Sequence, residues 1–446
     1  MLKYYETLYS DRRIKLMATV KAFPALRFTY SAGDISKNVC PPYDIISEEE
    51  RLGYISDSGN NIIRLEKPVG EDAYKKAQEL YLSWRKSGIL ENDEKSGFYV
   101  YEEEFEALGK TKKIRGIFAR VKLEEFSKGI VLPHEETLSK AKVDRFELMR
   151  ATRCNFSPVY SMYSDPERKV TSKLDNLGKP EIEFVAKDGV IQRLWKIDDE
   201  KTVAEIEKAF ETKQLFIADG HHRYETALNF RNHLLEEGVI KSDTENAGYI
   251  MMMLIDMEND GLVVFPTHRI VRDLDNFNTE KALEKIKEYF DVCEIDINDA
   301  EKVLSDNTDK KVFVMYDGEK SYLLTLVDTQ KAQEKLCEMN KGHTKAYTDL
   351  DVTVLHSLIL ENVLGIDKEN MANQINLGYT RDIEEAVQTV KSKKANCAFL
   401  INPTLVSQIK DAALAGEKMP QKSTYFYPKL ITGLVMNELC DYNTLK

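Results

Sequence analysis

Five consecutive residues, Asp219-Gly220-His221-His222-Arg223, combine the side chains that phosphate chemistry uses. The apolar run at 215–218 predicts a short strand and residues 224–235 predict a helix, so the motif lies at a strand-to-helix turn. The first N–H groups of a helix lack intrahelical partners, and the helix dipole is positive there, so this turn favours an anion. Gly220 permits a positive φ or a close backbone approach. Arg223 can donate two hydrogen bonds to phosphate oxygens, and a histidine can donate a proton.

Asp219 has three roles open to it at this turn. Its carboxylate could orient a histidine, hold Mg²⁺ or cap the helix. In the structural alternative, Asp219 is only the N-cap and His221 and His222 are polar residues of the first turn. The density of charged and imidazole groups favours the functional interpretation. Because adjacent residues point in different directions, we expect only one of the two histidines to face a ligand.

A second cluster, at 132–145, contains His134, Glu135 and Glu136 and then the charged residues Lys140, Lys142, Asp144 and Arg145. A glutamate beside a phosphate site can act as the general base on a substrate hydroxyl, so Glu135 and Glu136 are candidate catalytic residues together with the motif histidines. Lys142 and Arg145 can neutralise charge on a transferred phosphoryl group. The alternative is an ordinary solvated loop, because charge runs usually lie at the surface.

Further candidates for the pocket are His134, Asp144 and the pair His268-Arg269. Thr267-His268-Arg269 follows a predicted strand, and strand ends are where sites collect in α/β folds. Pro41-Pro42-Tyr43-Asp44 is more typical of a rigid turn. Lys422, Ser423, Tyr425 and Tyr427 fit either a packed terminal segment or a lid.

Composition excludes several classes of function. The 446 residues carry a formal charge of −12, which disfavours nucleic acid as a partner. Six cysteines lie scattered without metal-ligand spacing, as expected for reduced thiols. No apolar run approaches the roughly 18 to 20 residues that span a bilayer, so we expect a cytoplasmic protein without membrane contact. The chain also lacks a Walker loop, a GxGxxG helix start, GxSxG and HExxH.

The pattern of predicted elements indicates a mixed α/β (α+β) fold. We expect a helix at 71–86, a hairpin of 98–101 with 114–121, and a second hairpin of 249–255 with 262–265 that flanks the strand of the motif. A new unit begins near 274 and contains a hairpin of 312–316 with 322–326. Residues 419–429 are expected to precede a C-terminal helix. The predicted division is therefore 1–109, with 1–16 as an extension, then a core at 110–273, then 274–446.

Taken together, the motifs resemble those of the bacterial and archaeal domain-of-unknown-function family 1015. They are residues 218–227, Pro41-Pro42-Tyr43-Asp44, Pro133-His134-Glu135, 142–145, Thr267-His268-Arg269 and 419–426. The family is similar to the ParB/sulfiredoxin superfamily, in which a turn at a helix start binds nucleotide phosphates. The resemblance implies a ParB/sulfiredoxin-like central core with additional N- and C-terminal α/β domains. The superfamily includes free serine kinases, which have a comparable Asp-Gly-His turn and a His-Glu pair. By this resemblance, residues 219–223 would hold donor phosphates, and Glu135 or Glu136 would match the base.

The resulting hypothesis is a phosphotransferase of serine metabolism that converts free L-serine to O-phosphoserine. Mg²⁺ is the expected cofactor, with Asp219 as its candidate ligand, and the donor is ATP, ADP or pyrophosphate. The same site run backwards or with water gives a phosphoserine phosphatase. A non-catalytic ParB-like nucleotide-binding regulator is the alternative from another class, although the chain shows no helix-turn-helix domain or basic patch. A metal centre built from His134, His221, His222 and His268 is a further alternative.

Overall fold

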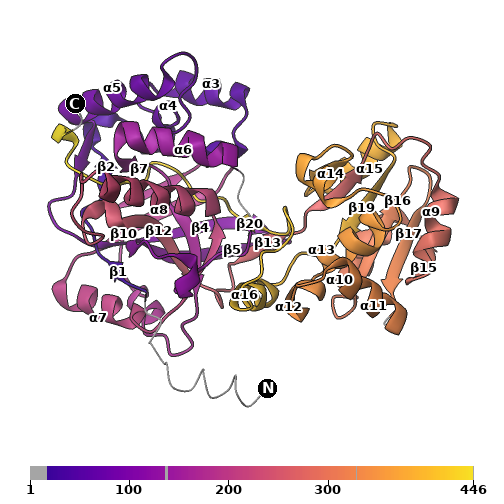
Figure 1. The fold of residues 1–446 in the computed structure, drawn as a ribbon. Helices are drawn as coiled ribbons and strands as arrows, with labels where there is room; N and C mark the ends of the chain where they lie inside the picture. Colours follow the sequence, from indigo (N-terminus) through magenta and orange to yellow (C-terminus); the bar gives the residue numbers. More distant parts are fainter. Residues whose placement is uncertain (1–17, 136–138, 328, 445–446) are drawn as a thin grey trace. The chain divides into compact units, whose positions relative to one another are not determined.

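The computed structural model describes residues 18–135, 139–327 and 329–444, which form two compact units (Figure 1). Within the described residues, the first unit comprises 18–133, 139–263 and 428–444. The second unit comprises 134–135, 264–327 and 329–427. The chain therefore leaves the first unit near residue 264 and returns to it for its last segment. The predicted three-part division cuts the chain at other points, and its boundary at 109/110 lies in the turn of a hairpin.

A mixed sheet forms the centre of the first unit, and its strand order is β6-β11-β8-β12-β5-β4-β10-β9. The pairs β11–β6 and β12–β8 are parallel, and the other pairs along this path are antiparallel. The strands are β4 (Phe98–Ala107), β5 (Lys110–Lys122), β6 (Val131–Leu132), β8 (Val159–Tyr163), β9 (Ile182–Val185), β10 (Ile191–Ile197), β11 (Leu215–Asp219) and β12 (Tyr249–Asp256), with β1 (Val20–Lys21) beside β5. Residues 250–255 of β12 are all buried, because a central strand is covered on both faces.

Two helices of the first unit lie at the motif: α8 (His221–Glu236), which begins within it, and α6 (Ser139–Thr152), which packs against α8. They lie side by side over the sheet, with α5 (Ala73–Lys86) next to α6 (Figure 1). Tyr224, Ala227 and Phe230 of α8 enter the main core together with Ile217 of β11 and Leu254 of β12. The other helices of this unit are α3 (Glu48–Asp57), α4 (Ile63–Glu66) and α7 (Glu200–Phe210), with the short α2 (Ile35–Asn38).

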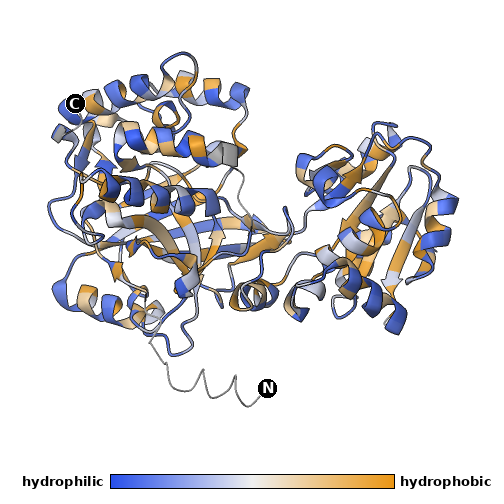
Figure 2. Ribbon diagram, in the orientation of Figure 1, coloured by the Kyte–Doolittle hydropathy of each residue, from blue (hydrophilic) through white to orange (hydrophobic). Residues whose placement is uncertain are grey.

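The second unit has its own antiparallel sheet, in the order β15-β17-β16-β19-β14-β18. Its strands are β14 (His268–Val271), β15 (Phe290–Ile295), β16 (Val312–Tyr316), β17 (Ser321–Leu326), β18 (Leu377–Thr380) and β19 (Cys397–Ile401). Its helices are α9 (Thr279–Ile286), α10 (Ala300–Ser305), α11 (Gln330–Met339), α12 (Lys345–Thr348), α13 (Asp351–Val354), α14 (Lys368–Asn373), α15 (Ile383–Lys391) and α16 (Val406–Leu414), with a π-helix at Leu355–Glu361. In both units, hydrophobic residues concentrate in the strands, and the helices alternate hydrophobic with hydrophilic positions (Figure 2).

The mixed α/β class is confirmed, as are the β4–β5 and β16–β17 hairpins and the strand-turn-helix at the motif. The second predicted hairpin is wrong. β12 pairs with β5 and β8, whereas β13 (Val263–Phe265) pairs with β20 (Tyr425–Tyr427). β12 also does not flank β11, because β8 lies between them. An apolar run indicates a strand but does not select its partner.

The predicted C-terminal helix is also wrong. Residues 430–439 form no helix and are almost entirely buried, with β21 (Asn437–Glu438) paired to β7 (Cys154–Asn155). Backbone hydrogen bonds link this segment to Leu26, Phe156 and Arg153. Apolar periodicity alone does not separate a buried extended segment from a buried helix. In the described part of the chain, no helix has both the length and the apolar character needed to cross a membrane.

Candidate functional site

The motif lies where β11 ends and α8 begins. Asp219 is the last residue of β11, and Gly220 is the N-cap of α8 with a φ of 90°. A Cβ atom at Gly220 would lie 2.9 Å from Nε and 3.0 Å from Cζ of Arg223. Glycine is therefore required here both for the backbone conformation and for the close approach of the guanidinium.

Asp219 faces two cations. Its Oδ2 lies 3.1 Å from Nζ of Lys429 and 3.7 Å from Nη2 of Arg223. Burial alone would raise the pKa of this carboxyl, but Lys429 and Arg223 outweigh it and hold the pKa well below its usual range. Asp219 therefore remains ionised, and together the three side chains carry one net positive charge at the helix N-terminus.

Arg223 folds back along the turn. Its Nη1 donates a hydrogen bond to the carbonyl of Pro158, and its side chain is only 11% exposed. The guanidinium is thus held between the end of β11 and the start of β8. This contact fixes the orientation of the cation before any ligand arrives.

The two histidines occupy different environments. His221 is buried, whereas His222 is half-buried. Burial lowers the pKa of His222, Lys142 and Arg223 lower it further, and Glu225 and Asp44 act in the opposite direction. His222 is therefore neutral near pH 7 and can accept a proton.

The neighbours of His222 bring two sequence motifs together. Asp44, from the Pro41-Pro42-Tyr43-Asp44 motif, is close enough to influence its charge. Lys142 donates a hydrogen bond of 2.8 Å to Oε2 of Glu225, one helical turn after His222. Residues that are nearly 180 positions apart in sequence thus surround the start of α8.

Arg145 is buried beside the same turn. Its Cζ lies 3.8 Å from the centre of the Tyr43 ring, and its Nε donates to Asp144 Oδ2 at 2.8 Å. Its Nη1 donates to the carbonyl of Glu66 at 2.8 Å and lies 3.5 Å from the Glu66 carboxylate. Burial raises the pKa of Tyr43 to about 12, although the charge of Arg145 acts against this rise. Tyr43 therefore presents a neutral ring and hydroxyl to the cluster.

Glu66 is a buried carboxylate that the sequence did not single out. Burial raises its pKa, and Arg145 and the Oγ of Ser157, which donates a hydrogen bond at 2.7 Å, oppose this rise. A cavity of about 30 Å³, which has room for one water molecule, is lined in part by Glu66, Arg145, Ser157 and Arg223. Arg145 and Arg223 therefore approach the same small space from two helices.

His134 and Glu135 belong to the second unit, and Glu136 lies outside the described residues. His134 is buried, with its Nε2 at 3.1 Å from Oγ1 of Thr424 and its carbonyl accepting from the N–H of Met419. Glu135 forms a parallel bridge with Met419. The 419–426 motif thus packs against the His-Glu motif.

His268 and Arg269 are both fully buried in β14. Arg269 donates to the carbonyls of Thr267 and Lys422 and to Nε2 of His356 at 3.3 Å, and burial lowers its pKa to about 10. Burial also lowers the pKa of His268 to about 4, so its ring is neutral. Nδ1 of His268 accepts from Ile401 N–H, and its Nε2 has no hydrogen-bond partner among the described residues.

Sequence reasoning singled out residues 219–223, Lys142, Asp144 and Arg145, and the structure gathers them around the start of α8. It missed Glu66, Ser157, Glu225 and Lys429. Glu225 had a local signal, since it lies one helical turn after His222 and within the 218–227 family motif. Among the described residues, no three His, Cys, Asp or Glu side chains lie close enough together to hold a metal ion.

The fold and site define a mixed α/β protein with a cationic strand-to-helix turn. The chain belongs to the family described as "Protein of unknown function (DUF1015)", whose model matches residues 20–353, and this confirms the family predicted from the motifs. No curated protein matches the chain in sequence.

Several solved structures are similar to the chain. A mutant free serine kinase in complex with AMP is 13% identical, with a TM-score of 0.36, and the match covers 73% of this chain and 91% of that one. A conserved hypothetical protein from Pyrococcus furiosus is 14% identical, with a TM-score of 0.34 and coverage of 73% and 95%. SbnI from Staphylococcus aureus, with a C-terminal truncation, is 9% identical, with a TM-score of 0.34 and coverage of 72% and 87%.

Proposed function

We propose that the protein is a small-molecule phosphotransferase that forms O-phosphoserine from free L-serine, with a nucleotide or pyrophosphate as donor. The observation that carries the proposal is the arrangement of Arg223 and Lys429 around Asp219 at the N-terminus of the 16-residue helix α8. Fixed cations and helix N–H groups stabilise the charge of phosphate oxygens. The choice of free L-serine as the acceptor rests on the resemblance of the sequence motifs to those of free serine kinases.

The cationic side chains around the start of α8 have separate roles in this proposal. Arg223 and Lys429 bind the donor phosphates, and Lys142 and Arg145 balance charge around the transferred phosphoryl group. In the transfer, the serine Oγ attacks phosphorus, its proton passes to a base, and the donor leaves with the electron pair of the broken P–O bond. His222 is a candidate base because its ring is neutral near pH 7. Glu135 or Glu136 is the base implied by the resemblance.

Asp219 fits a magnesium ligand of the kind that phosphate enzymes use. Mg²⁺ is commonly held by one or two carboxylates together with substrate phosphates. Among the described residues, Lys429 and Arg223 both approach Asp219 at Oδ2. When bound, Mg²⁺ would neutralise donor charge.

The test supplies the full chain with L-serine, Mg²⁺ and ATP, ADP or pyrophosphate, and detects O-phosphoserine by mass spectrometry. We expect product with at least one donor and its loss in Arg223→Ala. The matched control is Arg168→Ala, which removes a surface arginine that pairs with Asp175 in the same unit. If no donor yields O-phosphoserine, the proposal is wrong.

Two further assays separate this proposal from the alternatives. Phosphate released from O-phosphoserine without an acceptor would identify a phosphatase instead. Tight CTP binding with DNA association that weakens steeply with salt would identify a ParB-like regulator. Three variants test the candidates for the base: His222→Gln, Glu135→Gln and Glu136→Gln. The variant that lowers kcat and leaves donor binding intact identifies the base.

A further inference from the structure

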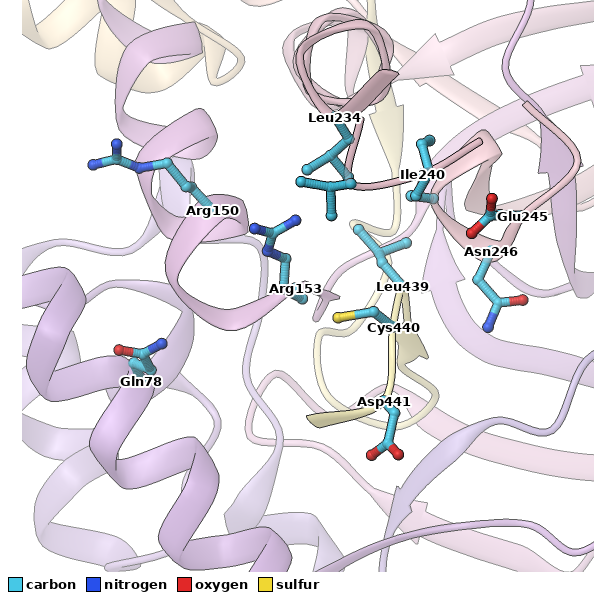
Figure 3. Close-up of a pocket in the computed structure, with 12 residues that line it drawn as sticks. Gln78, Arg150, Arg153, Leu234, Ile240, Glu245, Asn246, Leu439, Cys440 and Asp441 are labelled. Atoms are coloured by element: carbon cyan, nitrogen blue, oxygen red, sulfur yellow. The ribbon is translucent and has the colours of Figure 1, made fainter. Parts of the chain in front are cut away.

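A second cavity in the first unit lies away from the motif. It has a volume of about 650 Å³ and opens between the ends of α6 and α8 and the C-terminal segment (Figure 3). Its lining comprises Gln78, Arg150, Arg153, Leu234, Val239, Ile240, Glu245, Asn246, Ala247, Leu439, Cys440 and Asp441. None of these residues takes part in the phosphate site.

Along α8, the cavity and the motif lie at opposite ends of the helix. In α6, Arg145 lies in the middle of the helix, and Arg150 lies in its last turn, which leads to Arg153. In α8, the motif lies at the first turn and Leu234 in the last. A helix of 16 residues is about 24 Å long. The cavity is therefore a distinct site.

Arg153 is the chemical centre of this cavity. It follows the last residue of α6 with a φ of 51°, in the left-handed region that favours glycine or asparagine after a helix. Its N–H closes the helix on the carbonyl of Met149, and its carbonyl accepts from Leu439. An arginine at such a position carries backbone strain.

The guanidinium of Arg153 is half-buried, and among the described residues no carboxylate forms an ion pair with it. Its Cζ lies 5.2 Å from the centre of the Phe230 ring. The neighbouring Arg150 differs, because it pairs with Glu147 on its own helix. Arg153 thus offers a preoriented cation with open hydrogen-bond donors.

Part of the cavity wall next to Arg153 is apolar. Leu234, Ile240 and Leu439 are buried in the fold yet line this space, and Figure 3 shows them between Arg153 and Glu245. Glu245 and Asp441 lie on the sides away from Arg153. A negatively charged group therefore has one favourable place in the cavity, and a hydrocarbon group has the adjoining wall.

We propose that this cavity binds a small organic anion with an apolar body. Its charged head, a carboxylate or a phosphate, is held by Arg153, and its hydrocarbon body lies against Leu234, Ile240 and Leu439. The ligand binds without any reaction, so the proposal stands independently of the phosphotransferase activity.

The probes are hexanoate and hexyl phosphate, titrated into the full chain by calorimetry with hexanol and hexylammonium as uncharged and cationic comparisons. We expect at least one anion to bind with a Kd below about 1 mM and both comparisons to bind at least tenfold more weakly. The better of the two anions identifies the head group. Absence of binding by both anions, or equal binding of hexanol, would overturn the proposal.

The decisive variant is Arg153→Gly, because glycine is at ease at this φ and the protein should keep its fold. We expect it to weaken binding of the better anion at least tenfold. Arg168→Gly makes the same substitution at the same backbone conformation, with a φ of 53°, outside the cavity, and should bind within twofold of wild type. Thermal unfolding of both variants checks the fold. Equal affinity of Arg153→Gly and wild type would show that Arg153 does not hold the ligand.

Discussion

Lys429 and Asp219 form an ion pair of 3.1 Å although they are 210 positions apart in the sequence. Lys429 lies in the C-terminal segment (428–444), which belongs to the first unit and follows the second unit in the sequence. The candidate phosphate-binding turn therefore gains its contact with Lys429 only when the last part of the chain has packed. This contact joins the motif to a segment that carries no recognisable motif of its own.

Lys429→Ala is expected to weaken donor binding. The substitution removes one of two cations beside Asp219, and a hydrogen bond to a charged group contributes about 1.5–3 kcal/mol, which corresponds to roughly 10- to 160-fold in Kd. Calorimetric titration with ADP or pyrophosphate measures the change. Lys179→Ala, an exposed lysine of the same unit, is the control and should leave the Kd unchanged.

Gly220→Ala should destabilise the protein more than an ordinary glycine substitution. The added Cβ meets a φ of 90° and the Arg223 guanidinium at 2.9 Å, whereas Gly109 has a φ of 70° and nothing within 4 Å of its Cβ position. A strained left-handed residue costs about 1–3 kcal/mol. Urea unfolding should show Gly109→Ala at the low end of this range and Gly220→Ala at or above its upper end. Equal losses in the two variants would mean that Arg223 moves aside at no cost.

The sequence predicted the turn itself because every signal for it is local. The run at 215–218, Gly220 and the first turn of α8 are consecutive, and their chemistry can be read without knowledge of the fold. The partners of the turn come from elsewhere. Glu66 lies in the short helix α4, which contains no motif, and Lys429 lies three residues after the 419–426 motif, where nothing local relates it to Asp219.

The errors in the fold have the same cause. β12 was read correctly as a strand, but its partners β5 and β8 are chosen by the packing of the whole sheet. The segment at 430–439 is mostly apolar and forms no helix, because it is enclosed by the first unit and pairs with segments far from it in sequence. Local pattern thus determines the type of an element better than it determines the partners of that element.

His268 should make the protein less stable in mild acid. Its folded pKa of about 4 lies below the unfolded value of 6.5, so the unfolded chain binds a proton that the folded chain does not. The stability is therefore fully present above pH 6.5 and is lost as the pH falls toward 4. By pH 5 the loss from this group is about 2 kcal/mol.

Urea unfolding at pH 7 and pH 5 measures this effect. His268→Gln should reduce the difference in stability between the two pH values by a large part of that amount. Burial also lowers the pKa of His356, so some acid sensitivity will remain in His268→Gln. An unchanged pH difference in His268→Gln would contradict the prediction.

Arg145 and Glu66 should show strong coupling in a double-mutant cycle. Arg145→Ala leaves the Glu66 carboxylate buried without its cation, and breaking a buried pair in this way costs about 3–5 kcal/mol. Glu66→Gln should cost less, because Arg145 keeps its hydrogen bonds to Asp144 and to the backbone carbonyl of residue 66. In the Arg145→Ala background, Glu66→Gln should be neutral or stabilising, since it removes the unpaired charge. Urea unfolding of the four proteins gives the coupling energy. A coupling energy near zero would mean that the small cavity between them admits enough solvent to screen the two charges.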